Sequence, residues 1–227
     1  MKIKSLFLSA LLVSTVSGIQ AQVVVGPELG VTYSTMDMKI NGVNYDNKFV
    51  TGARVGAAFD INVDGQYYLQ PSLAFGFLHG AEGSYISYHS VSGGVPASER
   101  DERSYKLYSV QIPVLFTFKT DFQYSPNNFT FGIGPYVSFN YGGQYSRTYT
   151  TTLNGFDRPI YDDRPIRIGQ TPVKHDIIMF EIGAMAAVGY EMGNGFNVKL
   201  YYGFGFNNVA PDQGKRFPMI SEAREED

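Results

Sequence analysis

Four charged side chains occupy regular positions in stretches that are otherwise apolar or rich in glycine: Glu28, Arg54, Glu181 and Lys199. Each falls on the polar side of a stretch in which apolar and polar residues alternate, so all four are expected on one face of a sheet. If that face lines a narrow interior, the two acids and two bases should pair, because an isolated buried charge is costly. We interpret them as a structural charge network, with a gated ion path as the alternative.

Nucleophilic or metal chemistry has little support in this chain. There is no cysteine, and the three histidines, His79, His89 and His175, are scattered and do not lie beside a nucleophile in any motif. General base catalysis needs such a neighbour within hydrogen-bond reach, and a metal site needs clustered ligands. The sequence therefore predicts no catalytic residue, no metal and no cofactor, and a protein that is not an enzyme. A net charge of −3 without a basic block also argues against a nucleic-acid partner.

The first residues have the three parts of an export signal. Lys2 and Lys4 precede an apolar run at 6–16, and a small residue, Ala21, offers a cleavage site. We predict a signal peptide at 1–21 and one domain at 22–227. No later stretch has the roughly 20 apolar residues that a spanning helix needs. The mature protein is either soluble outside the cytoplasm or enters a membrane without helices.

The rest of the chain alternates apolar and polar residues with a period of two, which is the side-chain period of a β-strand. The 17 Phe, 17 Tyr and 25 Gly, against only 17% charged residues, exclude a disordered chain or a coiled coil. The alternation predicts an all-β protein with seven strands, at 23–34, 49–62, 67–78, 105–119, 129–141, 178–190 and 196–207.

The connections between these strands alternate in length. Long ones, at 35–48, 79–104 and 142–175, follow the first, third and fifth strands, whereas the others are short and contain turn residues such as Asp64-Gly65. This pattern predicts an antiparallel up-and-down barrel with meander topology, whose long loops all lie at one end. Transmembrane barrels have this asymmetry, with long extracellular loops.

The composition of the two faces indicates which one points outward. The polar face is rich in glycine and poor in charge, which suits a narrow lumen better than a surface exposed to water. The other face is apolar, with aromatic residues near the strand ends, as membrane interfaces select. We predict a transmembrane β-barrel of about eight strands in the outer membrane, in contact with lipid, with Glu28, Arg54, Glu181 and Lys199 as its barrel-lumen charge network. The alternative is a soluble periplasmic lipocalin-like carrier of apolar ligands.

Four segments carry a family resemblance: GPELGVTYS at 26–34, QIPVL at 111–115, FGIGPY at 131–136 and LYYGFGFNN at 200–208. In this order they resemble the PorT-like outer-membrane β-barrel family of the Bacteroidetes lineage. The resemblance implies an eight-stranded integral outer-membrane protein, and one branch of that family serves in protein secretion. The chain departs from the pattern at its end, where only 216–221 could form a last strand and Pro218 cannot donate a ladder hydrogen bond.

The long loops are the best candidates for function, because recognition commonly lies on loops that a rigid scaffold presents. The loop at 142–175 contains Asp-Arg-Pro-Ile twice, at 157–160 and 163–166, which favours an ordered loop. We expect a structural or interaction module of the envelope, whose partner is another envelope or secretion protein. A small pore is the alternative within the membrane.

Overall fold

The computed structural model describes residues 3–11, 23–40, 43–91, 95–122, 125–171 and 174–209. These residues form twelve strands and no helix. Accordingly, no helix in this part of the chain is long and apolar enough to cross a membrane. The strands are β1 (Ile3–Leu11), β2 (Val23–Met36), β3 (Lys39–Ile40), β4 (Val43–Asn44), β5 (Asp46–Lys48), β6 (Val50–Asp64), β7 (Tyr67–Val91), β8 (Val95–Lys119), β9 (Asn128–Leu153), β10 (Phe156–Pro165), β11 (Phe180–Glu191) and β12 (Asn197–Gly205).

Eight of the strands form a closed antiparallel ring. Each pairs with the next along the chain, in the order β1, β2, β6, β7, β8, β9, β11 and β12, and β12 pairs back onto β1. This confirms the all-β fold and the up-and-down order. The four further strands lie outside the ring: β5 pairs with β7, β10 pairs with β9, and β3 and β4 pair with each other.

The eighth place in the ring is taken by β1, which lies inside the stretch predicted as a signal peptide. Ile3 to Leu11 pair with β2, and Lys4 to Leu11 pair with β12. Residues 12–22, with the expected cleavage site, and 216–221, the candidate last strand, lie outside the described residues. Cleavage after Ala21 would remove β1, and the edges of β2 and β12 would then need another partner, because unpaired backbone groups in hydrocarbon cost several kcal/mol each.

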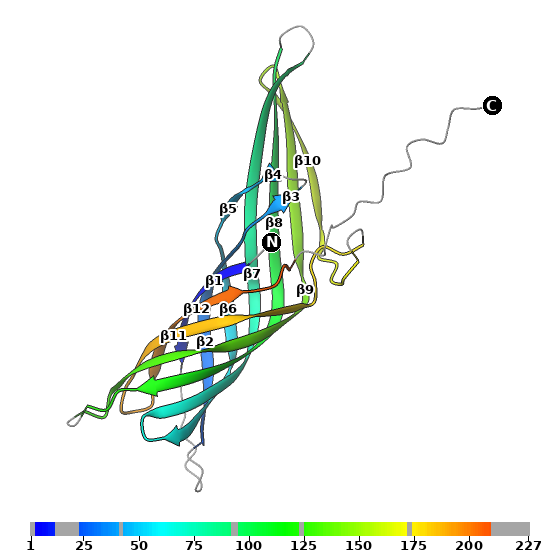
Figure 1. The fold of residues 1–227 in the computed structure, drawn as a ribbon. Coiled ribbons are helices and arrows are strands. Elements are labelled where there is room, and N and C mark those ends of the chain that lie inside the picture. The colour runs from blue at the N-terminus through cyan, green and yellow to red at the C-terminus, as the bar shows by residue number, and fades with distance from the viewer. Residues whose placement is uncertain are drawn as a thin grey trace.

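The strands that flank two of the long connections are much longer than predicted. The expected loop at 79–104 is largely the outer half of a β7–β8 hairpin, and the loop at 142–175 continues β9 and adds β10. We call residues 79–91, 95–107, 142–153 and β10 the outer extension. It is a four-stranded sheet, in the order β7-β8-β9-β10, that rises beyond the barrel (Figure 1).

A β-bulge marks the place where β7 leaves the barrel. The pairing of β7 with β8 shifts register between Gly76 and His79, and Leu78 takes a left-handed backbone conformation with φ of 58°. Phe77 and Leu78 both remain exposed as a result. A bulge bends its strand and increases the local twist, so it redirects β7 from the barrel wall into the outer extension.

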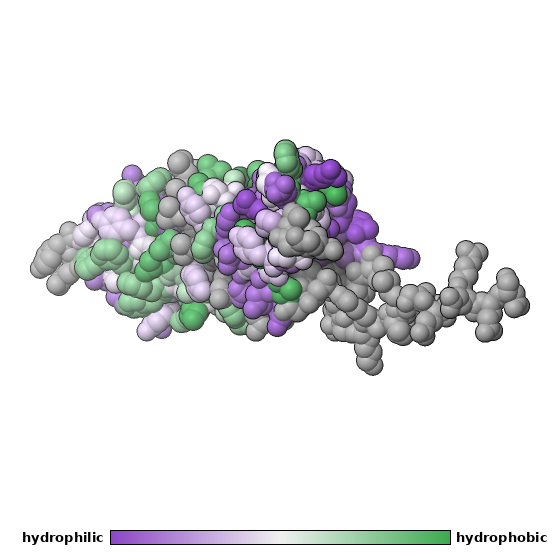
Figure 2. Space-filling model, turned by 90° about the horizontal axis from the view of Figure 1, so that it is seen from above, coloured by the Kyte–Doolittle hydropathy of each residue, from purple (hydrophilic) through white to green (hydrophobic). Residues whose placement is uncertain are grey.

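The barrel wall is apolar outside and polar inside. Every ring strand whose side chains are described exposes large apolar residues, such as Val31, Val55, Phe75, Phe116, Ile133, Val188 and Leu200. Figure 2 shows hydrophobic residues over the barrel and hydrophilic residues gathered over the outer extension. A lipocalin-like carrier would need the opposite arrangement, with the apolar face around an internal ligand.

Candidate functional site: the filled lumen and the outer extension

The centre of the lumen contains a fully buried ion pair. Nε of Arg54, on β6, lies 2.8 Å from Oε1 of Glu28, on β2, and neither side chain is exposed to solvent. Arg54 also donates hydrogen bonds to Gln111 (3.3 Å) and Ser72 (3.2 Å), and its guanidinium lies 5.3 Å from the ring centre of Tyr201. One arginine therefore links β2, β6, β7, β8 and β12 across the barrel.

The other two residues of the expected charge network take different partners. Glu181, on β11, accepts a hydrogen bond from the hydroxyl of Tyr136 on β9. Lys199, on β12, donates to Oε1 of Gln70 at 2.8 Å. The structure thus brings Glu28 and Arg54 together, but it places Glu181 and Lys199 in separate contacts inside the same lumen.

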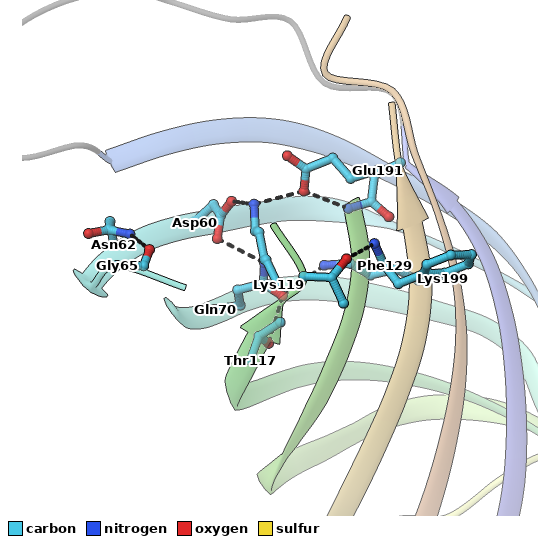
Figure 3. A network of polar contacts seen from close by, with 11 residues as sticks. Asp60, Asn62, Gly65, Gln70, Thr117, Lys119, Phe129, Glu191 and Lys199 are labelled. Carbon is cyan, nitrogen blue, oxygen red and sulfur yellow. Dashed lines mark hydrogen bonds and ion pairs between the residues drawn. The ribbon is translucent and has the colours of Figure 1, made fainter. Parts of the chain in front are cut away.

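Lys119 is the centre of a second network at the barrel end with the short turns. Its ammonium group lies between the carboxylates of Asp60 and Glu191, 2.7 Å from the latter (Figure 3). Gln70 joins the two lysines, because it donates to Asp60 (2.8 Å) and accepts from Lys199. A cavity of about 480 Å³ opens beside this network, between it and the turn that follows β11.

The sequence interpretation did not assign Lys119 and Glu191 to the lumen. Lys119 has the same parity as the inward-facing Thr117, and Glu191 has the same parity as Glu181. Both lie at the last position of their strands, where the apolar alternation ends and parity gives little guidance.

An apolar cluster, which we call the apolar cap, lies at the opposite end of the lumen. Its members come from the end of β2, the segment around β3 to β5, the outer strands and the segments after β10 and β12. All of them are buried: Met36, Met38, Tyr45, Ala81, Tyr105, Leu107, Tyr145, Ile166, Ile177 and Val209. In the segment at 35–48, expected as a long loop, Met36, Met38 and Tyr45 belong to this cluster, so these residues pack at the outer mouth of the barrel.

Asp101 anchors this cap to the outer extension. On β8, it accepts hydrogen bonds from Arg147 (2.8 Å), Arg103 (2.8 Å) and the hydroxyl of Tyr45 (2.8 Å). Burial alone would raise the pKa of the Asp101 carboxyl, but these hydrogen bonds outweigh burial and lower the pKa to about 2. Burial and the hydrogen bond to Asp101 raise the pKa of Tyr45 to about 12.

A second carboxylate fastens the segment that follows β10. Asp176 accepts two hydrogen bonds from Arg164 (2.6 and 2.9 Å) and further ones from Arg167, including its backbone N–H at 3.0 Å. Burial acts to raise the pKa of Asp176, yet these arginine contacts hold it well below its usual value. Arg164 belongs to the second Asp-Arg-Pro-Ile repeat, so this repeat is part of an ordered contact.

The three histidines lie in different parts of the structure. His79 is buried at the outer end of the barrel, and His89 is exposed on the outer extension. His175 contacts the backbone of Thr171 through Nδ1. Among the described residues there is no group of three or more His, Cys, Asp or Glu side chains arranged to hold a metal ion.

A family model described as "Outer membrane protein beta-barrel domain" matches residues 20–210. The matched stretch begins after β1 and includes all of the other strands. No match was found among curated proteins or among solved structures.

Proposed function

The chain belongs to the outer membrane protein β-barrel domain family, and from this premise we propose that it is a non-enzymatic interaction module of the cell envelope. Its barrel anchors it in the outer membrane, and the outer extension is the part that meets a partner. One observation carries the proposal: the lumen is filled by buried polar contacts and closed by an apolar cap, whereas a four-stranded sheet rises clear of the barrel.

The filled lumen argues against the alternative of a small pore. In an eight-stranded barrel the interior is just wide enough for side chains to fill it. Here the Glu28–Arg54 pair occupies the centre, and the cluster around Met36 and Leu107 covers the outer mouth. The cavity beside Lys119 is lined by residues at the barrel end with the short turns. An ion would have to displace both layers to cross.

The choice of partner follows from the resemblance of the sequence to the PorT-like family. A branch of that family serves in protein secretion, so a secretion protein or another envelope protein at the cell surface is the partner class we propose. The rigid anchoring of the outer extension through Asp101 and Asp176 supports a recognition role, because ordered surfaces lose less entropy on binding.

Conductance measurements test this function. Purified protein inserted into planar lipid bilayers is expected to give no steady current, and the variant Arg54→Ala is expected to stay closed because the apolar cap is intact. A steady single-channel conductance of the unmodified protein would overturn the interaction-module function in favour of a pore.

A further inference from the structure

The outer extension is a sheet with two edges, and only one of them is protected against further pairing. One edge is β10, which pairs with β9 on its inner side. The other is the outer part of β7, which pairs with β8 along 79–91. Edge strands present unpaired N–H and C=O groups and are blunted in most proteins by proline, charge or cover.

Proline and charge protect the β10 edge. The N–H of Ile166, just after β10, donates to the carbonyl of Gly143 on β9. Backbone N–H and C=O groups point to alternate sides along a strand. Those of the odd-numbered residues of β10 therefore point away from β9, and Pro159 and Pro165 are among these residues. Proline removes the N–H at these outward positions, and Asp157 and Asp163 add charge to the same strand.

The β7 edge has no such protection. The N–H of Gly80 donates to Oγ of Ser34 at 2.5 Å, on the side away from β8. By the same alternation, the N–H and C=O groups of Ile86, Tyr88 and Ser90 point to the free edge. Residues 85–91 contain no proline and no Asp, Glu, Lys or Arg. Among the described strands, β5 alone pairs on this side beyond the barrel, and it stops at Ser84.

We propose that the β7 edge at 86–91 is a docking site for an extended, uncharged peptide segment of a partner protein, which adds to the sheet as a further strand. The inference rests on the proposed function and names the surface that carries it. Backbone hydrogen bonds provide affinity in this mode of recognition, and alternate side chains provide specificity. Six residues span about 20 Å of edge at the usual rise of a strand.

The position of β5 sets the direction of the incoming strand. β5 pairs antiparallel with residues 82–84 of β7 on this same edge, so the peptide extends its line and runs toward the membrane. A second copy in the same membrane presents its β7 running outward, which gives parallel pairing, and parallel pairs are slightly less stable per residue. The uncharged edge favours a peptide of β-branched and aromatic residues, which pair well across strands.

A matched pair of proline variants tests the docking site. The probe is a fluorescein-labelled seven-residue peptide of alternating Thr and Val, titrated against the full chain in detergent micelles. Tyr88→Pro removes an outward N–H on the free edge, and Tyr161→Pro removes one on the protected edge; both tyrosines are well exposed, at 80% and 69%. We expect saturable binding to the unmodified protein and to Tyr161→Pro, and binding at least about tenfold weaker to Tyr88→Pro.

Several results would overturn the proposal. These are an absence of saturable peptide binding up to about 1 mM, and equal binding by Tyr88→Pro. Concentration-dependent association of the protein alone that Tyr88→Pro abolishes would assign the edge to a second copy instead. If Tyr88→Pro fails to fold, Ser90→Pro offers the same loss of an outward N–H. Failure of peptide binding leaves the proposed function standing, whereas a conducting lumen would overturn that function and not this edge.

Discussion

At the scale of single residues, the barrel depends on charges that have no access to water. Arg54 contributes an ion pair with Glu28 and two further hydrogen bonds, so one side chain satisfies polar groups from several strands. A buried pair of this kind adds little net stability over an apolar pair, but removing one partner leaves the other charge buried and unpaired. Changing one of the two residues should therefore lower the free energy of unfolding much more than changing both together.

Arg54→Ala should lower the free energy of unfolding by about 3–5 kcal/mol, because Glu28 then stays buried without its partner. The measurement is urea unfolding of the purified barrel, followed by the shift in gel migration between folded and boiled samples. The double variant Glu28→Gln, Arg54→Met is the control, and it should recover most of the loss. A decrease below about 1 kcal/mol for Arg54→Ala would mean that the pair does not support the barrel.

Asp101 should make the outer extension sensitive to acid. Its folded pKa, about 2, is lower than the ordinary value of 3.8, so the ionised form stabilises the extension above the ordinary pKa. That stabilisation should be lost as the pH falls from about 4 to 2. Hydrogen exchange of peptides from 95–107, corrected for intrinsic rates, should rise over this window.

Asp101→Asn should remove most of this pH dependence and raise exchange already at neutral pH. The exposed Asp163, on β10, provides the control, since Asp163→Asn should leave the acid transition in place. An acid transition that persists unchanged in Asp101→Asn would contradict the role assigned to this carboxylate.

At the scale of the elements, the sequence could predict the barrel but not the outer extension. The barrel strands alternate apolar and polar residues because one face meets an apolar environment and the other fills the lumen, and this alternation was readable in every segment. In the extension both faces are largely polar, as in the stretch Arg147 to Thr152. The apolar signal therefore stops at the edge of the barrel although the strands continue.

A turn signal for the missed strand was nevertheless present. Asn154 and Gly155 both have positive φ, of 50° and 82°, and they connect Leu153 of β9 to Phe156 of β10. Asn-Gly in a two-residue connection is the strongest short-range signal of a β-hairpin. The charge network could be predicted only in part from the sequence. The period-two pattern shows which side chains point into the lumen, but strand register and tilt decide which of those side chains meet.

Two glycines in β9 differ in how closely the neighbouring strand approaches them. A Cβ added to Gly134 would lie 1.9 Å from the carbonyl oxygen of Val114, whereas one added to Gly142 would meet only Cδ2 of Tyr108, at 3.4 Å. Gly134→Ala should destabilise the barrel by about 3 kcal/mol or more, since backbone must move, and Gly142→Ala should be tolerated. The folded fraction on unboiled gels distinguishes them, and equal behaviour would contradict this packing.

At the scale of the whole molecule, the wall, the lumen and the outer extension have different surfaces and different roles. The apolar wall suits lipid, the lumen is filled at the centre and capped at the outer mouth, and the extension carries the exposed polar surface and the free β7 edge. All long strands project from the same end, which the connection lengths also predicted. This arrangement requires the outer extension to face the exterior and the short turns to face the periplasm.

Cysteine labelling on intact cells tests this orientation without background, because the chain has no cysteine of its own. Tyr88→Cys lies on the outer extension, and Asn194→Cys lies in the turn between β11 and β12. With a maleimide reagent that cannot cross the outer membrane, we expect labelling of Tyr88→Cys on intact cells and labelling of Asn194→Cys only after the membrane is permeabilised. Labelling of Asn194→Cys on intact cells, or protection of Tyr88→Cys, would contradict this orientation.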